Sequence, residues 1–145
     1  MVDLGEYVRI LSTELCAALD PRAELSLDLG RADVTIETAV PSALVLNELL
    51  TNALKHGRSA DGVCRMRVAV SQDAAATTLR VEDQGPGLPA ARPGAGPIGM
   101  KIVNALVRQL GARLTTESAG GARVVITIPR AAPGEGASDV SAGSS

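Results

Sequence analysis

The sequence PSALVLNELLTNALKHG, residues 41–57, decides the fold expected of this chain and much of its function. Proline suits the first turn of a helix and glycine suits its end, so the segment predicts a helix from Pro41 to about Gly57. At 3.6 residues per turn, one side of this helix is apolar and a narrow polar arc lies opposite. The apolar side holds Leu46, Leu49, Leu50 and Ala53, and the polar arc holds Glu48, Thr51, Asn52 and Lys55.

Asn52 is the most informative residue of the polar arc. Asparagine is a poor helix former, so its place in mid-helix, one turn after Glu48, indicates a side chain kept for coordination. A carboxamide oxygen is a suitable single protein ligand for Mg²⁺, which takes most other ligands from water and substrate phosphates. Lys55, one turn further, can meet a phosphate as a point charge. A solvated surface helix would also carry a polar arc, so the helix alone leaves both interpretations open.

A second group of residues follows the strand expected at 77–83. Asp83 ends that strand, and Gly85 and Gly87 open the next loop in the sequence VEDQGPG. An ordinary aspartate turn has the same composition. At a buried strand end, however, a carboxylate can accept a hydrogen bond from the exocyclic amine of adenine, whereas guanine presents an acceptor there. The segment therefore predicts ATP in preference to GTP.

A glycine-rich stretch, GAGPIG at residues 94–99, formally matches the dinucleotide fingerprint. That fingerprint needs a strand directly before it, and here a proline-rich loop at 84–97 takes that place. A Walker loop fails as well, because Met100 stands where lysine is required. What remains is a loop that brings phosphate to the amino terminus of the next helix, where free N–H groups favour anions.

That next helix is expected at 98–111, since its apolar residues fall on one stripe and Gly111 can end it. Gly96 and Gly99 would allow the backbone to approach the phosphates closely, and Lys101 would add positive charge. The nucleotide is thus expected between this helix and the helix at 41–57.

Hydrophobic periodicity places the remaining elements. A helix is expected at 4–19, and hairpins are expected at 64–83 and 112–129. A further hairpin is expected from strands 23–29 and 32–38 around a Gly30-Arg31 turn. Three helices packed on one face of a mixed, mostly antiparallel sheet would bury every apolar stripe, which predicts an α/β (α+β) two-layer sandwich.

The composition narrows the domain organisation and the classes of function. Residues 131–145 are small and polar, so we expect one domain at 1–130 and a disordered tail. The chain has 14 Lys and Arg against 16 Asp and Glu and no basic block that could bind a phosphate backbone. Tyr7 is the single aromatic residue, so bases have no stacking platform. Nucleic acid is therefore not an expected partner. No apolar run approaches the ~20 residues that span a bilayer, so we expect a cytoplasmic location without membrane contact. Both cysteines lie in apolar contexts and are expected to be reduced core residues.

These segments together resemble the GHKL ATPase superfamily, which includes histidine kinases, type II topoisomerases and the large heat-shock chaperones. PSALVLNELLTNALKHG resembles the N box, VEDQGPGLP the first glycine box and IGMKIVNALVRQLGARL the second. The closing SAGGARVVITIP is similar to the last hairpin of the family. The histidine kinases with a short lid are the most similar subfamily, although its phenylalanine-bearing lid segment is absent from this chain. The resemblance implies a histidine kinase/gyrase-type fold and the catalytic domain of a bacterial sensor histidine kinase.

The resemblance also implies the roles of individual residues. Glu48 stands where related ATPases place the base that activates the nucleophile, Asn52 holds Mg²⁺, and Asp83 reads the adenine of ATP. The expected nucleotide-binding residues are Asn52, Lys55, His56, Asp83, Gly85, Gly87, Gly96, Gly99 and Lys101.

The phosphoacceptor is expected outside this chain. His56 is the only histidine, and its place in the N box favours a pocket-lining residue over an acceptor of phosphate. The implied partners are therefore a histidine-bearing dimerisation domain and, through it, a response regulator, while the fragment itself is expected to be monomeric. Two other functions stay open at this point: a nucleotide-binding or interaction module without kinase activity, and a serine kinase of the anti-sigma-factor type.

Overall fold

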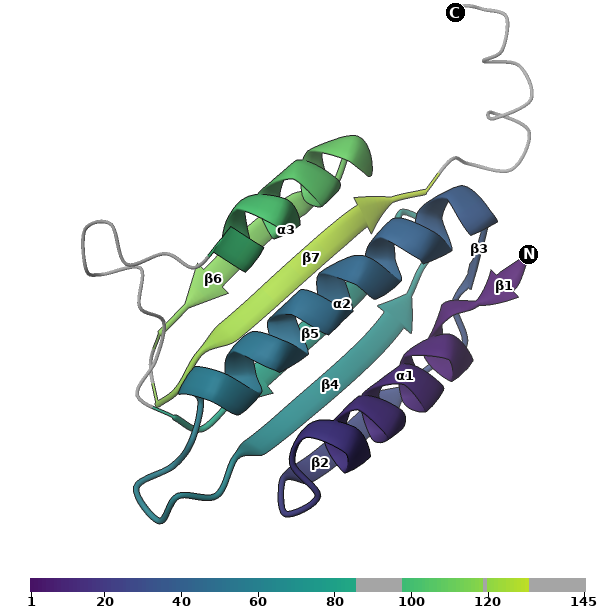
Figure 1. Cartoon of the computed structure of the whole chain (residues 1–145). Helices are drawn as coiled ribbons and strands as arrows, with labels where there is room; N and C mark the ends of the chain where they lie inside the picture. The colour runs from purple at the N-terminus through teal and green to yellow at the C-terminus, as the bar shows by residue number, and fades with distance from the viewer. Residues whose placement is uncertain (86–97, 119, 131–145) are drawn as a thin grey trace, which may run out of the picture.

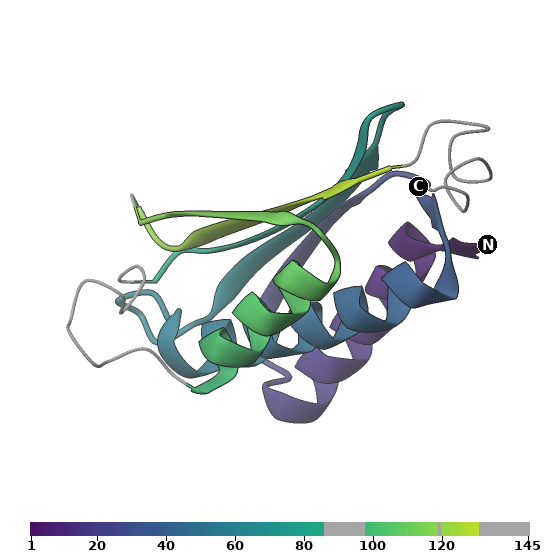
Figure 2. The ribbon, with the colours of Figure 1, turned by 90° about the horizontal axis from the view of Figure 1, so that it is seen from above.

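Three helices lie on one face of a five-stranded sheet (Figure 1 and Figure 2). The computed structural model describes residues 1–85, 98–118 and 120–130. The helices are α1 (Leu4–Leu19), α2 (Ile36–His56) and α3 (Ile98–Gln109). The strands are β1 (Val2–Asp3), β2 (Glu24–Leu29), β3 (Asp33–Val34), β4 (Arg65–Gln72), β5 (Ala76–Asp83), β6 (Arg113–Glu117) and β7 (Arg123–Pro129).

The sheet is mixed, with strand order β2-β4-β5-β7-β6. β2 and β4 are parallel, and every other neighbouring pair in this sheet is antiparallel. β1 and β3 form a separate antiparallel pair beside the first helix. The predicted two-layer sandwich, with three helices on a mostly antiparallel sheet, is therefore confirmed.

The core forms where the central strands meet α2. Alternate residues of β4 and β5 point toward the helices, and Val68 and Leu79 among them are almost fully buried. α2 lies between α1 and α3 and runs along the middle of this face (Figure 1). Its apolar side is buried as predicted, at Leu46, Leu49, Leu50 and Ala53.

The predicted hairpin at 23–38 is wrong. Its first half does form β2, but β2 pairs in parallel with β4, in a register that joins Glu24 to Arg65. Of its second half, only β3 is extended, and β3 pairs with β1 at the amino terminus of the chain. Alternation of apolar and polar residues identified a strand that is covered on one face, but it carries no information about which strand is the partner.

The predicted start of the second helix is also wrong, because α2 begins five residues before Pro41. Ile36 at its start is 58% exposed, and residues 32–38 alternate apolar with polar side chains, a pattern that favours a strand there. Pro41 falls in the second turn, where it cannot donate the hydrogen bond that its position would direct to Glu37. The neighbouring hydroxyl of Ser42 donates to the carbonyl of Thr38 at 2.7 Å.

The end of α3 agrees with the prediction that Gly111 stops the helix. Gly111 adopts a φ of 65°, and its N–H donates to the carbonyl of Arg108 at 3.0 Å. The N–H of Ala112 donates to the carbonyl of Val107, also at 3.0 Å. This pair of bonds is the Schellman motif, which requires a left-handed residue and so favours glycine. The hairpins β4–β5 and β6–β7 form as predicted.

Three other expectations have different outcomes. Cys16 and Cys64 are buried free thiols, as predicted. Within the described ranges, none of the helices has both the length and the apolar character needed to cross a membrane. The greater part of the proline-rich loop, residues 86–97, and the tail at 131–145 lie outside the described residues.

Burial along α2 generates a stability prediction. Leu50 is fully buried, and truncation to alanine removes buried methyl groups and leaves a cavity, so Leu50→Ala should lower the free energy of unfolding by about 2 to 5 kcal/mol. Leu44 lies on the same helix at 51% exposure, and Leu44→Ala should cost less than about 0.5 kcal/mol. Urea denaturation of both variants measures the difference, and equal losses would contradict the assigned core face of α2.

Candidate functional site

Asp83 is the last residue of β5 and lies in the row of that strand that faces the helices. Its Oδ1 accepts hydrogen bonds from the N–H of Gly85 at 2.9 Å and from the N–H of Ala122 at 3.2 Å. Its own N–H donates to the carbonyl of Ala122 at 2.9 Å. The described part of the chain offers no hydrogen bond to Oδ2. One carboxylate oxygen is therefore fixed by the backbone, and the other can meet a ligand.

The environment of Asp83 also changes its acidity. Burial of the half-buried carboxyl raises its pKa, because desolvation disfavours the charged form, and the hydrogen bonds from Gly85 and Ala122 offset this only in part. A carboxylate held in this way at the edge of a core is a feature of functional sites more than of surface turns.

Two glycines bring other parts of the backbone against Asp83. A Cβ on Gly57, the residue that follows α2, would lie 2.7 Å from both Cγ and Oδ2 of Asp83. A Cβ on Gly85 would lie 2.4 Å from the carbonyl carbon of Gly57. Since real Cβ contacts are longer than these distances, both positions need the absence of a side chain. The end of α2, the end of β5 and the turn after β5 therefore converge at one point.

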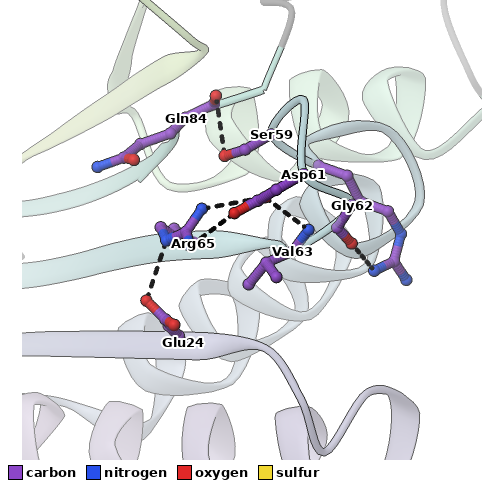
Figure 3. Close-up of polar contacts among 8 residues, drawn as sticks. Glu24, Ser59, Asp61, Gly62, Val63, Arg65 and Gln84 are labelled. Atoms are coloured by element: carbon purple, nitrogen blue, oxygen red, sulfur yellow. Dashed lines mark hydrogen bonds and ion pairs between the residues drawn. The ribbon is translucent and has the colours of Figure 1, made fainter.

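The loop that follows α2 is anchored to the strands beside it (Figure 3). Arg65 at the start of β4 pairs with Asp61 of the loop at 2.9 Å and with Glu24 of β2 at 3.0 Å. The N–H of Gln84 donates to the carbonyl of Arg65 at 3.2 Å, and the Ser59 hydroxyl donates to the carbonyl of Gln84 at 3.4 Å. These contacts tie the loop to the strand end that carries the candidate carboxylate.

The polar arc of α2 leads away from this point along the helix. Glu48, Thr51 and Asn52 are half-buried, whereas Lys55 and His56 are exposed. At a rise of 1.5 Å per residue, Asn52 and Glu48 lie roughly 7 and 13 Å from Gly57 along the helix axis. From its carboxyl end backwards, α2 therefore offers first the contact with Asp83, then the amide of Asn52 and then the carboxylate of Glu48.

The remaining predicted residues differ in how close the structure places them to Asp83. Gly85 lies against Gly57 beside Asp83, as described above. Gly99 belongs to the first turn of α3, and Lys101 in the next turn is exposed. Gly87 and Gly96 lie outside the described residues. The described structure thus brings together the carboxylate, one loop glycine and α2.

Three residues of the site were not predicted from the sequence: Gly57, which was expected only to stop a helix, Gly121 and Ala122. The N–H of Ala122 donates to the side chain of Asp83, and the carbonyl of Ala122 accepts from the N–H of Asp83, although the two residues are 39 positions apart. The sequence held one usable signal, the Gly120-Gly121 pair in the β6–β7 turn, because adjacent glycines often mark a close backbone approach.

Comparisons with known proteins identify the family of this chain. Residues 38–132 match the family described as histidine kinase-, DNA gyrase B-, and HSP90-like ATPase. The chain belongs to this family. Blue-light-activated histidine kinase 2 of Erythrobacter litoralis is 34% identical over 136 residues, which cover 89% of the present chain and 39% of that protein.

Solved structures give the same result for the fold. The histidine kinase domain of the blue-light-activated kinase EL346 of Erythrobacter litoralis superposes with a TM-score of 0.78 and 30% identity, over 88% of this chain and 61% of that one. The mycobacterial sensor histidine kinase MprB superposes with a TM-score of 0.68 at 21% identity, over 88% of this chain and 95% of that one, and supports the fold alone. This ATPase domain is thus of the histidine-kinase catalytic type and spans about two fifths of its curated relative.

The buried carboxylate of this ATPase domain generates a prediction about pH. Because the folded pKa of Asp83 lies above the ordinary value of 3.8, the folded state holds the proton more tightly, and stability falls as pH rises from 3.8 through the folded pKa. Asp83→Asn keeps an oxygen for both backbone donors and removes the buried charge. At neutral pH the free energy of unfolding of this variant should therefore exceed that of the wild type. The gain should be about 1.4 kcal/mol for each tenfold difference in proton affinity of Asp83 between the folded and unfolded states.

Urea denaturation of the ligand-free domain at several pH values measures this effect, with exposed Asp28→Asn as the control that should show no such gain. A less stable Asp83→Asn domain at neutral pH would contradict the assigned environment.

Proposed function

We propose that this domain binds ATP with Mg²⁺ and transfers the γ-phosphoryl group to a histidine on a separate dimerisation domain of a sensor histidine kinase. The observation that carries the proposal is the Asp83 carboxylate, with one oxygen fixed by two backbone N–H groups and the other beside Gly57, where no side chain covers it. Membership of the ATPase family supports ATP as the ligand.

The fixed carboxylate supports adenine as the base. An exocyclic amine of adenine can donate a hydrogen bond to Oδ2 of Asp83, whereas the O6 acceptor of guanine would leave a half-buried carboxylate unpaired. Gly57 keeps the space beside Oδ2 free, because a Cβ there would lie 2.7 Å from that oxygen. The acceptor that Asp83 offers therefore fits the amine donor of adenine.

The chemistry of α2 supports Mg²⁺ as the metal. In the described ranges no three His, Cys, Asp or Glu residues cluster as a metal site, so no preformed carboxylate cage is available there. Mg²⁺ suits a site with one protein oxygen, here the amide of Asn52, with phosphates and water as the other ligands. Bound Mg²⁺ would neutralise charge on the phosphates, while Lys55, Lys101 and the amino terminus of α3 hold their oxygens.

Glu48 is proposed to orient the acceptor. Phosphoryl transfer depends on positioning and charge neutralisation more than on covalent chemistry by the protein. The Glu48 carboxylate accepts a hydrogen bond from one N–H of the acceptor imidazole and takes that proton while the other nitrogen attacks the γ-phosphorus and forms the N–P bond. The bond from phosphorus to the bridging oxygen then breaks, and ADP leaves.

The acceptor is proposed to lie outside this chain. His56 adjoins Gly57, which packs against Asp83. His56 therefore lies at the end of α2 where adenine is proposed to bind, and not beside Glu48. That position supports a pocket-lining role for His56. The histidine and the response regulator that receives its phosphoryl group then belong to the parts of the kinase that this chain does not span.

Substitution of the proposed metal ligand tests the Mg²⁺ site. Asn52→Ala should weaken ATP binding in the presence of Mg²⁺ at least tenfold, with a much smaller effect when EDTA is present, because only the metal-linked contact is lost. Asn47 is also half-buried on α2 but lies about 140° around the helix, so Asn47→Ala is the matched control and should change affinity less than threefold. Titration with a fluorescent ATP analogue measures both, and unchanged Mg²⁺-dependent binding by Asn52→Ala would reject the assignment.

Substitution of the orienting carboxylate tests the transfer step. Glu48→Gln should retain ATP affinity within about threefold but lower phosphoryl transfer to an added dimerisation domain by 10²-fold or more, the typical size of a general-base effect. The readout is acid-labile label on the acceptor from γ-labelled ATP. Acid-stable label would favour the serine-kinase alternative, and ATP binding without any transfer would favour the interaction module.

A further inference from the structure

We infer that base specificity in this domain is set by the β6–β7 turn acting on Asp83, with Gly121 as the specificity-determining position. The inference rests on the proposed adenine site and adds to it. Discrimination between adenine and guanine then depends on the side chain at position 83 and also on the orientation that the turn imposes on it.

The turn holds Asp83 at two points. The N–H of Asp83 donates to the carbonyl of Ala122 at 2.9 Å, and the N–H of Ala122 donates to Oδ1 at 3.2 Å. Main chain and side chain of the same residue are thus bound by one residue of the turn. With the bond from Gly85, Oδ1 receives two N–H groups, and the carboxyl group cannot rotate without breaking both.

Gly121 is the residue that permits this contact. It adopts a φ of 126°, and a Cβ built on it would lie 2.0 Å from the carbonyl oxygen of Asp83. That neighbour is backbone, so it cannot move aside as a flexible side chain could. Gly120 also has a positive φ, 70°, but a Cβ there meets nothing within 4 Å. Alanine at either glycine would therefore strain the backbone. Only alanine at Gly121 would also collide with Asp83, the residue proposed to read the base.

The fixed orientation has a consequence for asparagine at position 83. An amide would place its oxygen toward the two N–H groups of Gly85 and Ala122, because its NH₂ group has no lone pair to accept them. The NH₂ group would then occupy the position of Oδ2 and face the base. A donor at that position repels the amine of adenine and complements the O6 acceptor of guanine. Asp83→Asn should therefore shift the preference from ATP toward GTP instead of weakening both equally.

Displacement of a fluorescent nucleotide analogue by ATP and by GTP tests the inference on the whole chain, with circular dichroism as the check of folding. The wild type should bind ATP at least tenfold more tightly than GTP. Asp83→Asn should move the ratio of the two Kd values at least 100-fold toward GTP. Gly121→Ala should lower ATP affinity at least tenfold and bring the ratio near one, whereas Gly120→Ala should stay within threefold of the wild type in both.

A folded Gly121→Ala domain with the wild-type ratio, or an Asp83→Asn domain that loses ATP and GTP equally, would overturn the inference. Where Gly121→Ala fails to fold, Gly57→Ala takes its place, since Gly57 has an ordinary φ of −99° and a Cβ there would press on Oδ2 itself. It should also lower the ratio, and an unchanged ratio would count against the inference. A wild type that binds neither nucleotide would instead reject the proposed function.

Discussion

The carboxyl group of Asp83, held by the backbone of Gly85 and Ala122, is the contact on which the rest of the site depends. Three segments that are distant in sequence meet there: the end of α2 at Gly57, the end of β5 and the start of β7. Each comes within reach only because a glycine leaves room for another backbone. The sheet supplies the rigid part of this arrangement, since β5 lies between β4 and β7 and its end cannot shift without disturbing both neighbours.

This arrangement is costly for the folded domain and useful for a nucleotide site. A half-buried carboxyl group with a raised pKa destabilises the ligand-free protein relative to a neutral residue of the same shape. Oδ1 recovers part of the lost hydration through its two backbone bonds, and Oδ2 would recover more when a donor from a ligand reaches it. Local instability of this kind is typical of positions that are kept for binding, and it explains why an aspartate stands at the end of an otherwise buried row of β5.

Local patterns predicted the elements whose partners are close in sequence, and they failed where the partner is remote. The hairpins at 64–83 and 112–129 and the apolar side of α2 follow from alternation and helical spacing. β2 was assigned to the wrong neighbour because its partner β4 begins only after the whole of α2. Within the site, the strand end at Asp83 and the polar arc of α2 could be read from the sequence. The roles of Gly57 and Ala122 could not, because they exist only once the sheet has brought distant backbones together.

The parallel connection from β2 through α2 to β4 explains why α2 can act as the long axis of the site. A crossover helix must run the full length of the sheet to join two parallel strands, so its last residues arrive at the sheet end where β4 begins and β5 finishes. Gly57 therefore meets Asp83 as a result of topology. Each turn back along the helix then displaces a side chain by about 5.4 Å from that contact. A ligand with a base at one end and a charged chain at the other would meet Asp83, Asn52 and Glu48 in that order, which is the order that a nucleotide and an incoming acceptor require.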